Sequence, residues 1–172
     1  MDFCSKFHHL NDENHLYKEI TYDDLKDKFY NRESGLFLIG GDWCPKTQAI
    51  IKEANAIAKR EGLDVIYFYD PRFINVFGEV EDLRDCLTLE HKLDYYFIIE
   101  RLGYKNFKGE LVKDTLIQKM DSPTFFVLKD GISRGYFTTR YIKDPYIRLE
   151  SDLDDKTLEF DKELTELISK MK

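Results

Sequence analysis

The chain of 172 residues carries 26 Lys and Arg against 33 Asp and Glu, which gives a formal net charge of −7. Aromatic residues make up 15% of the chain, enough for a packed core, so an intrinsically disordered protein is disfavoured. The acidic balance argues against a nucleic-acid partner, which would require a basic surface. No apolar run approaches the ~18 residues of a membrane span, and no secretory signal opens the chain. We therefore expect one cytoplasmic domain over residues 1–172.

The first half of the sequence predicts alternating helices and strands. Residues 1–18 are polar without a clear period and predict an irregular arm or a short helix. Thr21 is a candidate N-cap for the helix that follows it. The apolar run at 36–40 predicts a strand buried on both faces. A helix at 45–60, with Pro in its first turn, and a second strand at 64–70 complete a strand–helix–strand unit, which predicts a parallel sheet.

The segment 71–121 is longer than a simple crossover between two strands requires. Val80, Leu83 and Leu87 have the spacing of one apolar helical face, and further apolar positions up to Gly103 extend the pattern. We therefore expect a mostly helical insertion here.

The last part of the sequence predicts a hairpin, a loop and a helix. Apolar strands at 125–128 and 132–138 flank Lys-Asp-Gly at 129–131, a tight-turn signal. Pro and many charges at 139–155 predict a loop, and 156–170 predicts an amphipathic helix. The order of these elements predicts an α/β fold.

The three cysteines, Cys4, Cys44 and Cys86, have spacings that support neither a zinc ribbon nor a disulfide framework. Cys86 lies at the spacing of the apolar positions in the insertion. Burial in the core is therefore the preferred interpretation, and a distant resolving thiol is the alternative. The N-terminal histidines match no tight metal site, so we expect a solvated arm and no bound metal: His8, His9 and His15.

Cys44 differs from the other two cysteines because it lies between a buried strand and the start of a helix. Its thiol should face free backbone N–H groups and the positive end of the helix dipole, both of which stabilise a thiolate. Lys46 and the hydroxyl of Thr47 lie in the same turn and act in the same direction, whereas Asp42 opposes them. The balance predicts a lowered pKa for Cys44.

Two segments together resemble the thioredoxin superfamily. LFLIGGDWCPKTQAIIKEANAIAKREGLDVIYFYD, at 36–70, resembles its active-site strand, helix and following strand, and DSPTFFVLKDG, at 121–131, resembles its cis-proline loop and terminal hairpin. The strand ending in Ile-Gly before Cys-Pro is also similar to thioredoxin-like accessory proteins of Gram-positive bacteriocin systems. The resemblance implies a thioredoxin-like fold, a central mixed sheet with helices on both faces, and a helical insertion before the cis-proline strand.

The resemblance also implies roles for individual residues. Cys44 matches the nucleophilic cysteine, and Pro123 matches the cis-proline that faces its sulfur. Trp43 matches the aromatic residue that shields the site. Pro45 and Ser122 fall at substrate-binding positions, where Ser122 would offer backbone hydrogen bonds to an extended substrate. No cofactor is implied.

Two positions depart from the pattern of the dithiol thioredoxins. Thr47 replaces the resolving cysteine, which gives a CxxT motif without an internal disulfide, and Leu38 replaces the buried acid of the preceding strand. Two functions fit. One is a single-cysteine oxidoreductase acting on a protein disulfide or a low-molecular-weight mixed disulfide, with an external thiol as the resolving group. The other is a non-catalytic thioredoxin-fold module that binds a partner.

Both ends of the 71–121 insertion should lie near the thiol, because sites in open α/β sheets lie beyond the carboxyl ends of parallel strands. The insertion is expected either to wall the site or to pack elsewhere and enlarge the core. In the first case its aromatic side chains would contact a substrate or partner: Phe73, Phe77, Tyr95, Tyr96 and Phe97.

Overall fold

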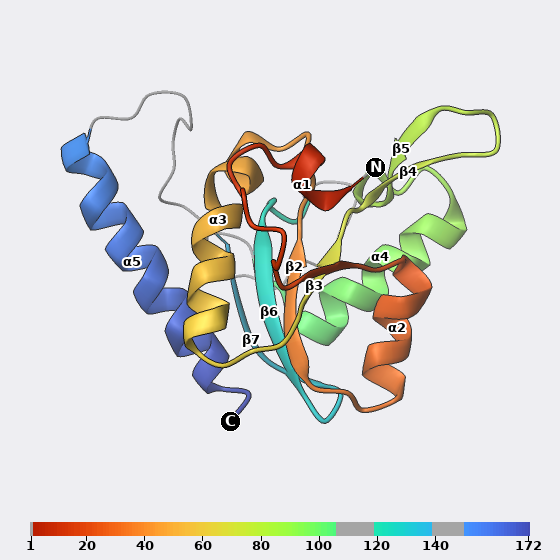
Figure 1. The fold of residues 1–172 in the computed structure, drawn as a ribbon. Helices are drawn as coiled ribbons and strands as arrows, with labels where there is room; N and C mark the ends of the chain where they lie inside the picture. The colour runs from red at the N-terminus through yellow and green to blue at the C-terminus, as the bar shows by residue number, and fades with distance from the viewer. Residues whose placement is uncertain (1, 106–118, 139–149) are drawn as a thin grey trace.

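The computed structural model describes residues 2–105, 119–138 and 150–172, with side chains from 157 onward in the last range. It is an α/β fold in which helices cover both faces of a mixed five-stranded sheet (Figure 1). The strands lie in the order β1 (Tyr17–Glu19), β3 (Ile66–Tyr69), β2 (Gly35–Ile39), β6 (Thr124–Lys129) and β7 (Ile132–Thr138). The expectation of an α/β fold is therefore confirmed.

The sheet combines a parallel half with an antiparallel half. β1 and β2 both run parallel to β3, as a strand–helix–strand unit requires. β6 pairs antiparallel with β2, and β7 antiparallel with β6. Asp130 and Gly131, both with positive φ, form the two-residue connection of the predicted β6–β7 hairpin.

Alternate residues of β2 serve two separate cores. Leu36 and Leu38 pack under α3 (Pro45–Arg60) and α5 (Glu150–Ser169), while Phe37 and Ile39 pack under α2 (Tyr22–Tyr30) and α4 (Leu89–Leu102). Figure 1 shows these two helix pairs on opposite faces of the sheet. The period of two along a strand produces this arrangement, since every residue of β2 is buried.

Local signals fix the starts of α2 and α3. Thr21 and Asp24 form a reciprocal capping box at the start of α2, as the N-cap prediction requires. α3 begins with Pro45 in its first turn, where a missing N–H leaves no helical hydrogen bond unmade. Its last turn is followed by Gly62, which has a φ of 80°.

The N-terminal segment contains a short helix, one of its two expected forms, but it is not the solvated arm that its composition suggests. It holds the short helix α1 (Phe3–Lys6), and the side chains of Phe7 and Leu10 are buried against the α3 face of the sheet. Asn55 of α3 donates a hydrogen bond to Asp12 and accepts one from the backbone of Leu16. The segment therefore completes one core, and its last residues lead into the edge strand β1.

The insertion begins with a hairpin, so the helix expected over Val80 to Leu87 is wrong. β4 (Arg72–Ile74) and β5 (Val80–Asp82) pair antiparallel, and the single turn η1 (Leu83–Asp85) follows. Asn75 accepts hydrogen bonds from the backbone at 77 and 79, which closes the hairpin turn. Val80 and Leu87 are exposed, so their helical spacing does not mark a buried face.

The rest of the insertion and the chain end show further agreement and one correction. α4 confirms the helical part of the insertion, while residues 106–118 lie outside the described part of the chain. α5 begins at Glu150, so the loop expected over 139–155 is wrong for its last six positions, and 139–149 are not described. In the described ranges, no helix is both long and apolar enough to cross a membrane.

Candidate functional site

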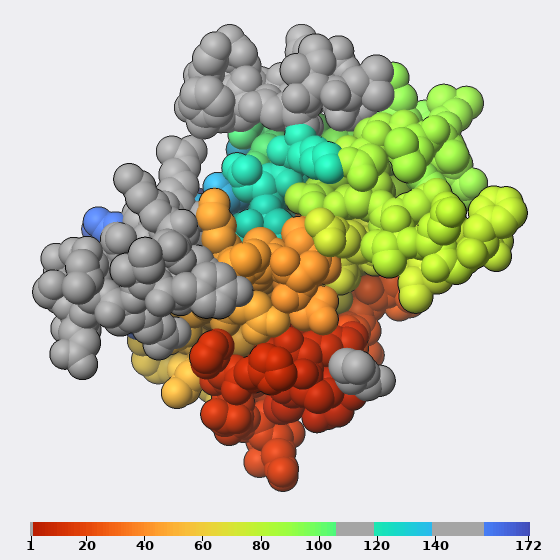
Figure 2. Space-filling view, turned by 90° about the horizontal axis from the view of Figure 1, so that it is seen from above, coloured from red at the N-terminus to blue at the C-terminus, as the bar shows by residue number. Residues whose placement is uncertain are grey.

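Cys44 is the N-cap residue of α3, at the carboxyl end of the parallel half of the sheet. Its side chain is 7% exposed, and its Sγ lies 3.5 Å from the carbonyl oxygen of Ser122. The bond between Ser122 and Pro123 is cis, the geometry that the resemblance implies for this position. The fold thus brings together two segments 78 residues apart, and Figure 2 shows them meeting the insertion on one face.

Hydrogen-bond donors around the sulfur favour its ionised form. Burial by itself raises the pKa of Cys44, but hydrogen bonds from the side chains of Ser122 and Thr47 oppose this effect. The backbone N–H groups of Thr47 and Lys46 act in the same direction, and together the donors hold the pKa of Cys44 below its ordinary value. Lys46 therefore contributes through its backbone at the helix start.

Two glycines before the motif make room for its side chains. A Cβ atom on Gly40 would lie 2.7 Å from Oγ1 of Thr47, and one on Gly41 would lie 1.9 Å from Nε1 of Trp43. Both distances are too short for any side chain. Gly40 therefore allows Thr47 to be fully buried, with its Oγ1 3.4 Å from Oγ of Ser122. Gly41 allows the indole of Trp43 to lie against the backbone.

The indole of Trp43 is held by a carboxylate at the end of the neighbouring strand. Its Nε1–H donates to Oδ1 of Asp70, the residue after β3, at 3.0 Å. Burial raises the pKa of Asp70, as do the nearby carboxylates of Asp42 and Asp82, although the hydrogen bonds from Trp43 and the backbone of Arg72 oppose this shift. Asp70 therefore links the motif to the start of the insertion.

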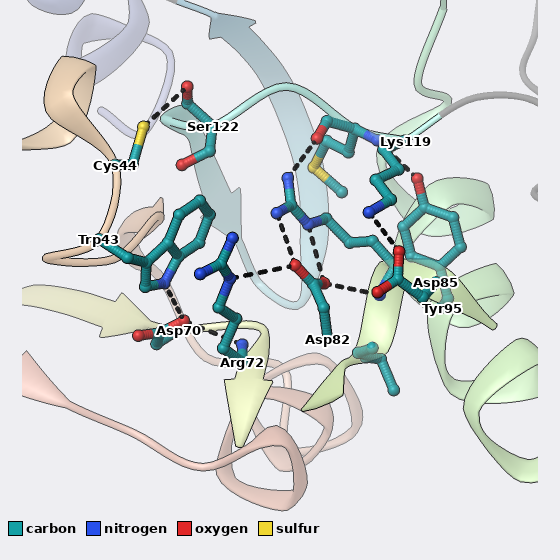
Figure 3. Close-up of polar contacts among 12 residues, drawn as sticks. Trp43, Cys44, Asp70, Arg72, Asp82, Asp85, Tyr95, Lys119 and Ser122 are labelled. Atoms are coloured by element: carbon teal, nitrogen blue, oxygen red, sulfur yellow. Dashed lines mark hydrogen bonds and ion pairs between the residues drawn. The ribbon is translucent and has the colours of Figure 1, made fainter. Parts of the chain in front are cut away.

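Two arginines of the insertion face the indole, and Figure 3 shows the nearer one, Arg72, beside it. The guanidinium carbon of Arg72 lies 3.8 Å from the centre of the Trp43 ring, and that of Arg84 lies 5.1 Å from it. The guanidinium of Arg84 donates two hydrogen bonds to buried Asp82, at 3.0 and 2.7 Å, and Arg72 lies 3.6 Å from the same carboxylate. Although burial raises the pKa of Asp82, its hydrogen bonds and ion pair with Arg84 hold that pKa below its ordinary value.

The insertion also contacts the segment that leads to the cis-proline. Arg84 donates to the carbonyl of Met120 at 2.9 Å, and the hydroxyl of Tyr95 accepts from the backbone N–H of Met120 at 2.7 Å. Tyr104 exchanges hydrogen bonds with Asp121. The insertion therefore lies beside the site: it contacts the residue before Cys44, and contacts within the insertion hold its own last two residues directly before Ser122.

The side chains of the insertion that lie beside the site differ from the aromatic ones expected from the sequence. The residues that reach Trp43 are arginines, whereas Tyr95 is buried in the core and Phe97 packs edge-on against Phe29. Phe77 is 84% exposed at the tip of the hairpin. Arginine can replace an aromatic side chain in this position because its planar guanidinium stacks on an indole face.

The remaining candidates lie partly in the site and partly away from it. Cys86 is buried in the core of the insertion, as expected, but it follows a single turn rather than lying within a helix. Pro45 is exposed at the helix start and Pro123 is buried. Across residues 2–105, 119–138 and 157–172, no group of three His, Cys, Asp or Glu side chains could hold a metal ion.

Sequence reasoning missed four residues that shape the site: Asp70, Arg72, Asp82 and Arg84. Asp70 carried a usable signal, because a polar residue directly after a buried parallel strand lies at the edge where such sites form. Asp82 and Arg84 gave no such signal. Their contacts depend on the β4–β5 hairpin, whereas the apolar spacing in this segment predicted a helix. The pair of glycines before Asp42 was also a signal of close approach.

A lowered-pKa thiol, a backbone carbonyl and a carboxylate-bound indole thus lie together at one end of the sheet. Such a thiol can attack the sulfur of a disulfide that approaches along Ser122. A comparison of the sequence with protein-family models finds no family that matches it. A comparison with curated proteins also gives no match.

Proposed function

We propose that the protein is a thioredoxin-like oxidoreductase that exchanges thiols and disulfides through Cys44 alone. The observation that carries this proposal is the position of the Cys44 sulfur at the start of α3, where hydrogen-bond donors lower its pKa. The mixed sheet and the cis bond before Pro123 support a thioredoxin-like fold. The proposed substrates are protein disulfides or mixed disulfides with a low-molecular-weight thiol.

The reaction requires two exchanges. The Cys44 thiolate attacks one sulfur of the substrate disulfide, and a new S–S bond forms while the second sulfur leaves as a thiolate and takes a proton from water. An external thiol, such as glutathione, then loses its proton and attacks the substrate-derived sulfur of the mixed disulfide. This step returns the Cys44 thiolate and releases a new disulfide, so the external thiol becomes oxidised while the leaving sulfur of the substrate is reduced.

Thr47 explains why the resolving thiol must come from outside. It occupies the position where a dithiol motif would carry its second cysteine, and it is fully buried. A threonine hydroxyl cannot form a disulfide, but it can hydrogen-bond the thiolate and stabilise it as a leaving group when the adduct is resolved.

The direct test uses a peptide–glutathione mixed disulfide with reduced glutathione in excess. We expect the protein to accelerate release of the peptide thiol, and Cys44→Ser to lose that activity entirely. Cys86→Ser is the matched control, since it also removes one buried thiol and should retain the rate. If the wild-type protein releases no more peptide than Cys44→Ser does, the proposed function is wrong.

The second candidate is a non-catalytic module that binds a protein partner at the same face. The 7% exposure of Cys44 favours it, because a large substrate must displace neighbouring side chains to reach the sulfur. This candidate predicts no turnover in the peptide assay and equal partner binding by the wild type and Cys44→Ser.

A further inference from the structure

We propose that Arg72 is a positioning residue through which the insertion fixes the indole of Trp43 and so restricts access to the Cys44 sulfur. The effect on catalysis rests on the proposed function, whereas the effect on Trp43 does not. The inference assigns a role in the site to the β4–β5 hairpin, which carries Arg72.

Three contacts hold the indole. The Gly41 backbone lies close enough that an added Cβ would overlap the ring nitrogen. That nitrogen donates its hydrogen to Asp70, and the guanidinium of Arg72 stacks on the ring at 3.8 Å. Figure 3 shows the indole between Cys44 and Arg72. If Arg72 were removed, the ring would lose the nearer of its two contacts with arginines of the insertion, and only Arg84 at 5.1 Å would stay on that side.

Arg72 can act as a fixed contact because it is itself anchored, although its side chain is 41% exposed. Its backbone N–H donates to Asp70 at 2.9 Å, and its guanidinium lies 3.6 Å from Asp82. Asp82 is in turn held by two hydrogen bonds from the guanidinium of Arg84, which also donates to the carbonyl of Met120. The chain of contacts runs from the hairpin to the segment before the cis-proline.

Access to Cys44 should depend on this anchoring. With the thiol 7% exposed, a reagent larger than a few atoms reaches the sulfur only when a neighbouring side chain moves aside. Trp43 is adjacent in sequence and only half-buried, so it is the side chain whose movement would widen the approach. Loss of one stacking contact should increase the population of displaced indole about two- to fivefold.

The first experiment measures the indole directly, which is possible because Trp43 is the single tryptophan of the chain. In Arg72→Ala we expect the fluorescence emission to shift to the red and quenching by acrylamide to increase. Arg101→Ala is the matched control, because Arg101 also belongs to the insertion and stacks on aromatic rings, those of Phe97 and Tyr30. That variant should leave the emission unchanged.

The second experiment compares two alkylating reagents on Cys44, with mass spectrometry as the readout. In Arg72→Ala, the rate with a bulky maleimide should rise about two- to fivefold relative to the rate with iodoacetamide. Arg72→Lys keeps the positive charge but lacks the planar guanidinium. Its maleimide rate relative to iodoacetamide should therefore lie between those of the wild type and Arg72→Ala. A general loss of folding would instead raise the reactivity of buried Cys86 too, so Cys86 serves as an internal control.

The proposal is overturned if Arg72→Ala keeps both the emission and the reagent ratio of the wild type. That result would leave the proposed function intact, since the peptide assay measures turnover separately. Conversely, a red-shifted emission with no peptide turnover in the wild type would support the positioning role and refute the oxidoreductase.

Discussion

Cys44 and Cys86 are almost equally buried, with 7% and 8% of their surfaces exposed, yet their surroundings differ in chemistry. Cys44 has one carbonyl oxygen nearby, that of Ser122 at 3.5 Å, but its sulfur also meets the backbone N–H groups of a helix start and two hydroxyls. The sulfur of Cys86 lies 3.9 and 3.7 Å from the carbonyl oxygens of Leu83 and Arg84. Carbonyl oxygens accept a hydrogen bond from a thiol but offer no donor to a thiolate.

The contrast shows that burial alone does not identify a reactive cysteine. Exposure would rank the two residues as equals, whereas the donors around the sulfur distinguish them. The position in the fold supplies those donors: Cys44 opens a long helix, while Cys86 ends a single turn. Two substitutions and one measurement on the wild type test this contrast, and the largest expected effect comes from a substitution in the core that contains Cys86.

Breaking the buried ion pair between Asp82 and Arg84 should destabilise the core that contains Cys86. Asp82→Asn leaves Arg84 buried without its counter-charge, and we expect the free energy of unfolding to fall by about 3 kcal/mol. The pKa of Asp82 lies below its ordinary value, so its stabilisation is present above about pH 4 and is lost as the pH falls through its lowered pKa. Urea unfolding at several pH values measures the difference, which should shrink in acid.

A matched control for that prediction exists on the other face of the sheet. Arg60 and Asp161 form an equally well-aligned pair, with two contacts of 2.8 Å, but both side chains are more than a third exposed. Asp161→Asn should therefore cost much less stability than Asp82→Asn, because solvent screens an exposed pair. If the two variants lose equal stability, burial does not explain how much the Asp82–Arg84 pair contributes to the free energy of unfolding.

The comparison itself predicts a ranking of reactivity. In the folded wild type at neutral pH, iodoacetamide should alkylate Cys44 at least about tenfold faster than Cys86, and faster than the half-buried Cys4. Mass spectrometry after a short pulse ranks the three sites. The interpretation of Cys44 as a nucleophile fails if it is the slowest of them.

The smallest expected effect comes from a single hydroxyl. Thr47→Val keeps the shape of the side chain and removes a hydrogen bond to the thiolate, so the pKa of Cys44 should rise. The alkylation rate at neutral pH should fall about two- to fivefold. Thr88→Val, which removes a hydroxyl two residues from Cys86, should not alter the Cys44 rate. An unchanged pH profile in Thr47→Val would show that the backbone donors suffice.

Sequence reasoning succeeded where the signal was local. The cap at Thr21, the proline at the start of α3 and the turn at Asp130 each depend on a few neighbouring residues. The position of Cys44 was also predictable, because a cysteine that lies between a strand and a helix meets the free N–H groups at the start of that helix.

Sequence reasoning failed where the local pattern was misleading or where contacts between separate segments decide the structure. The apolar spacing from Val80 to Leu87 imitates a helix, but the turn at Asn75 and Gly78 makes a hairpin there. The aromatic residues Phe3 and Phe7 lie one helical turn apart, a pattern hidden by the polar residues around them. A stacking contact between Arg72 and Trp43 leaves no trace in the sequence, because neither residue type requires the other.

The alternation along β2 has a consequence for cooperativity. Because Leu38 faces one core and Phe37 the other, neither layer of helices can separate without disturbing the strand that the opposite layer needs. The two faces should therefore unfold together, in a single transition rather than in two steps. The Cys44 thiol, five residues beyond the end of that strand, is protected in the same way, so its geometry should persist until the whole molecule unfolds.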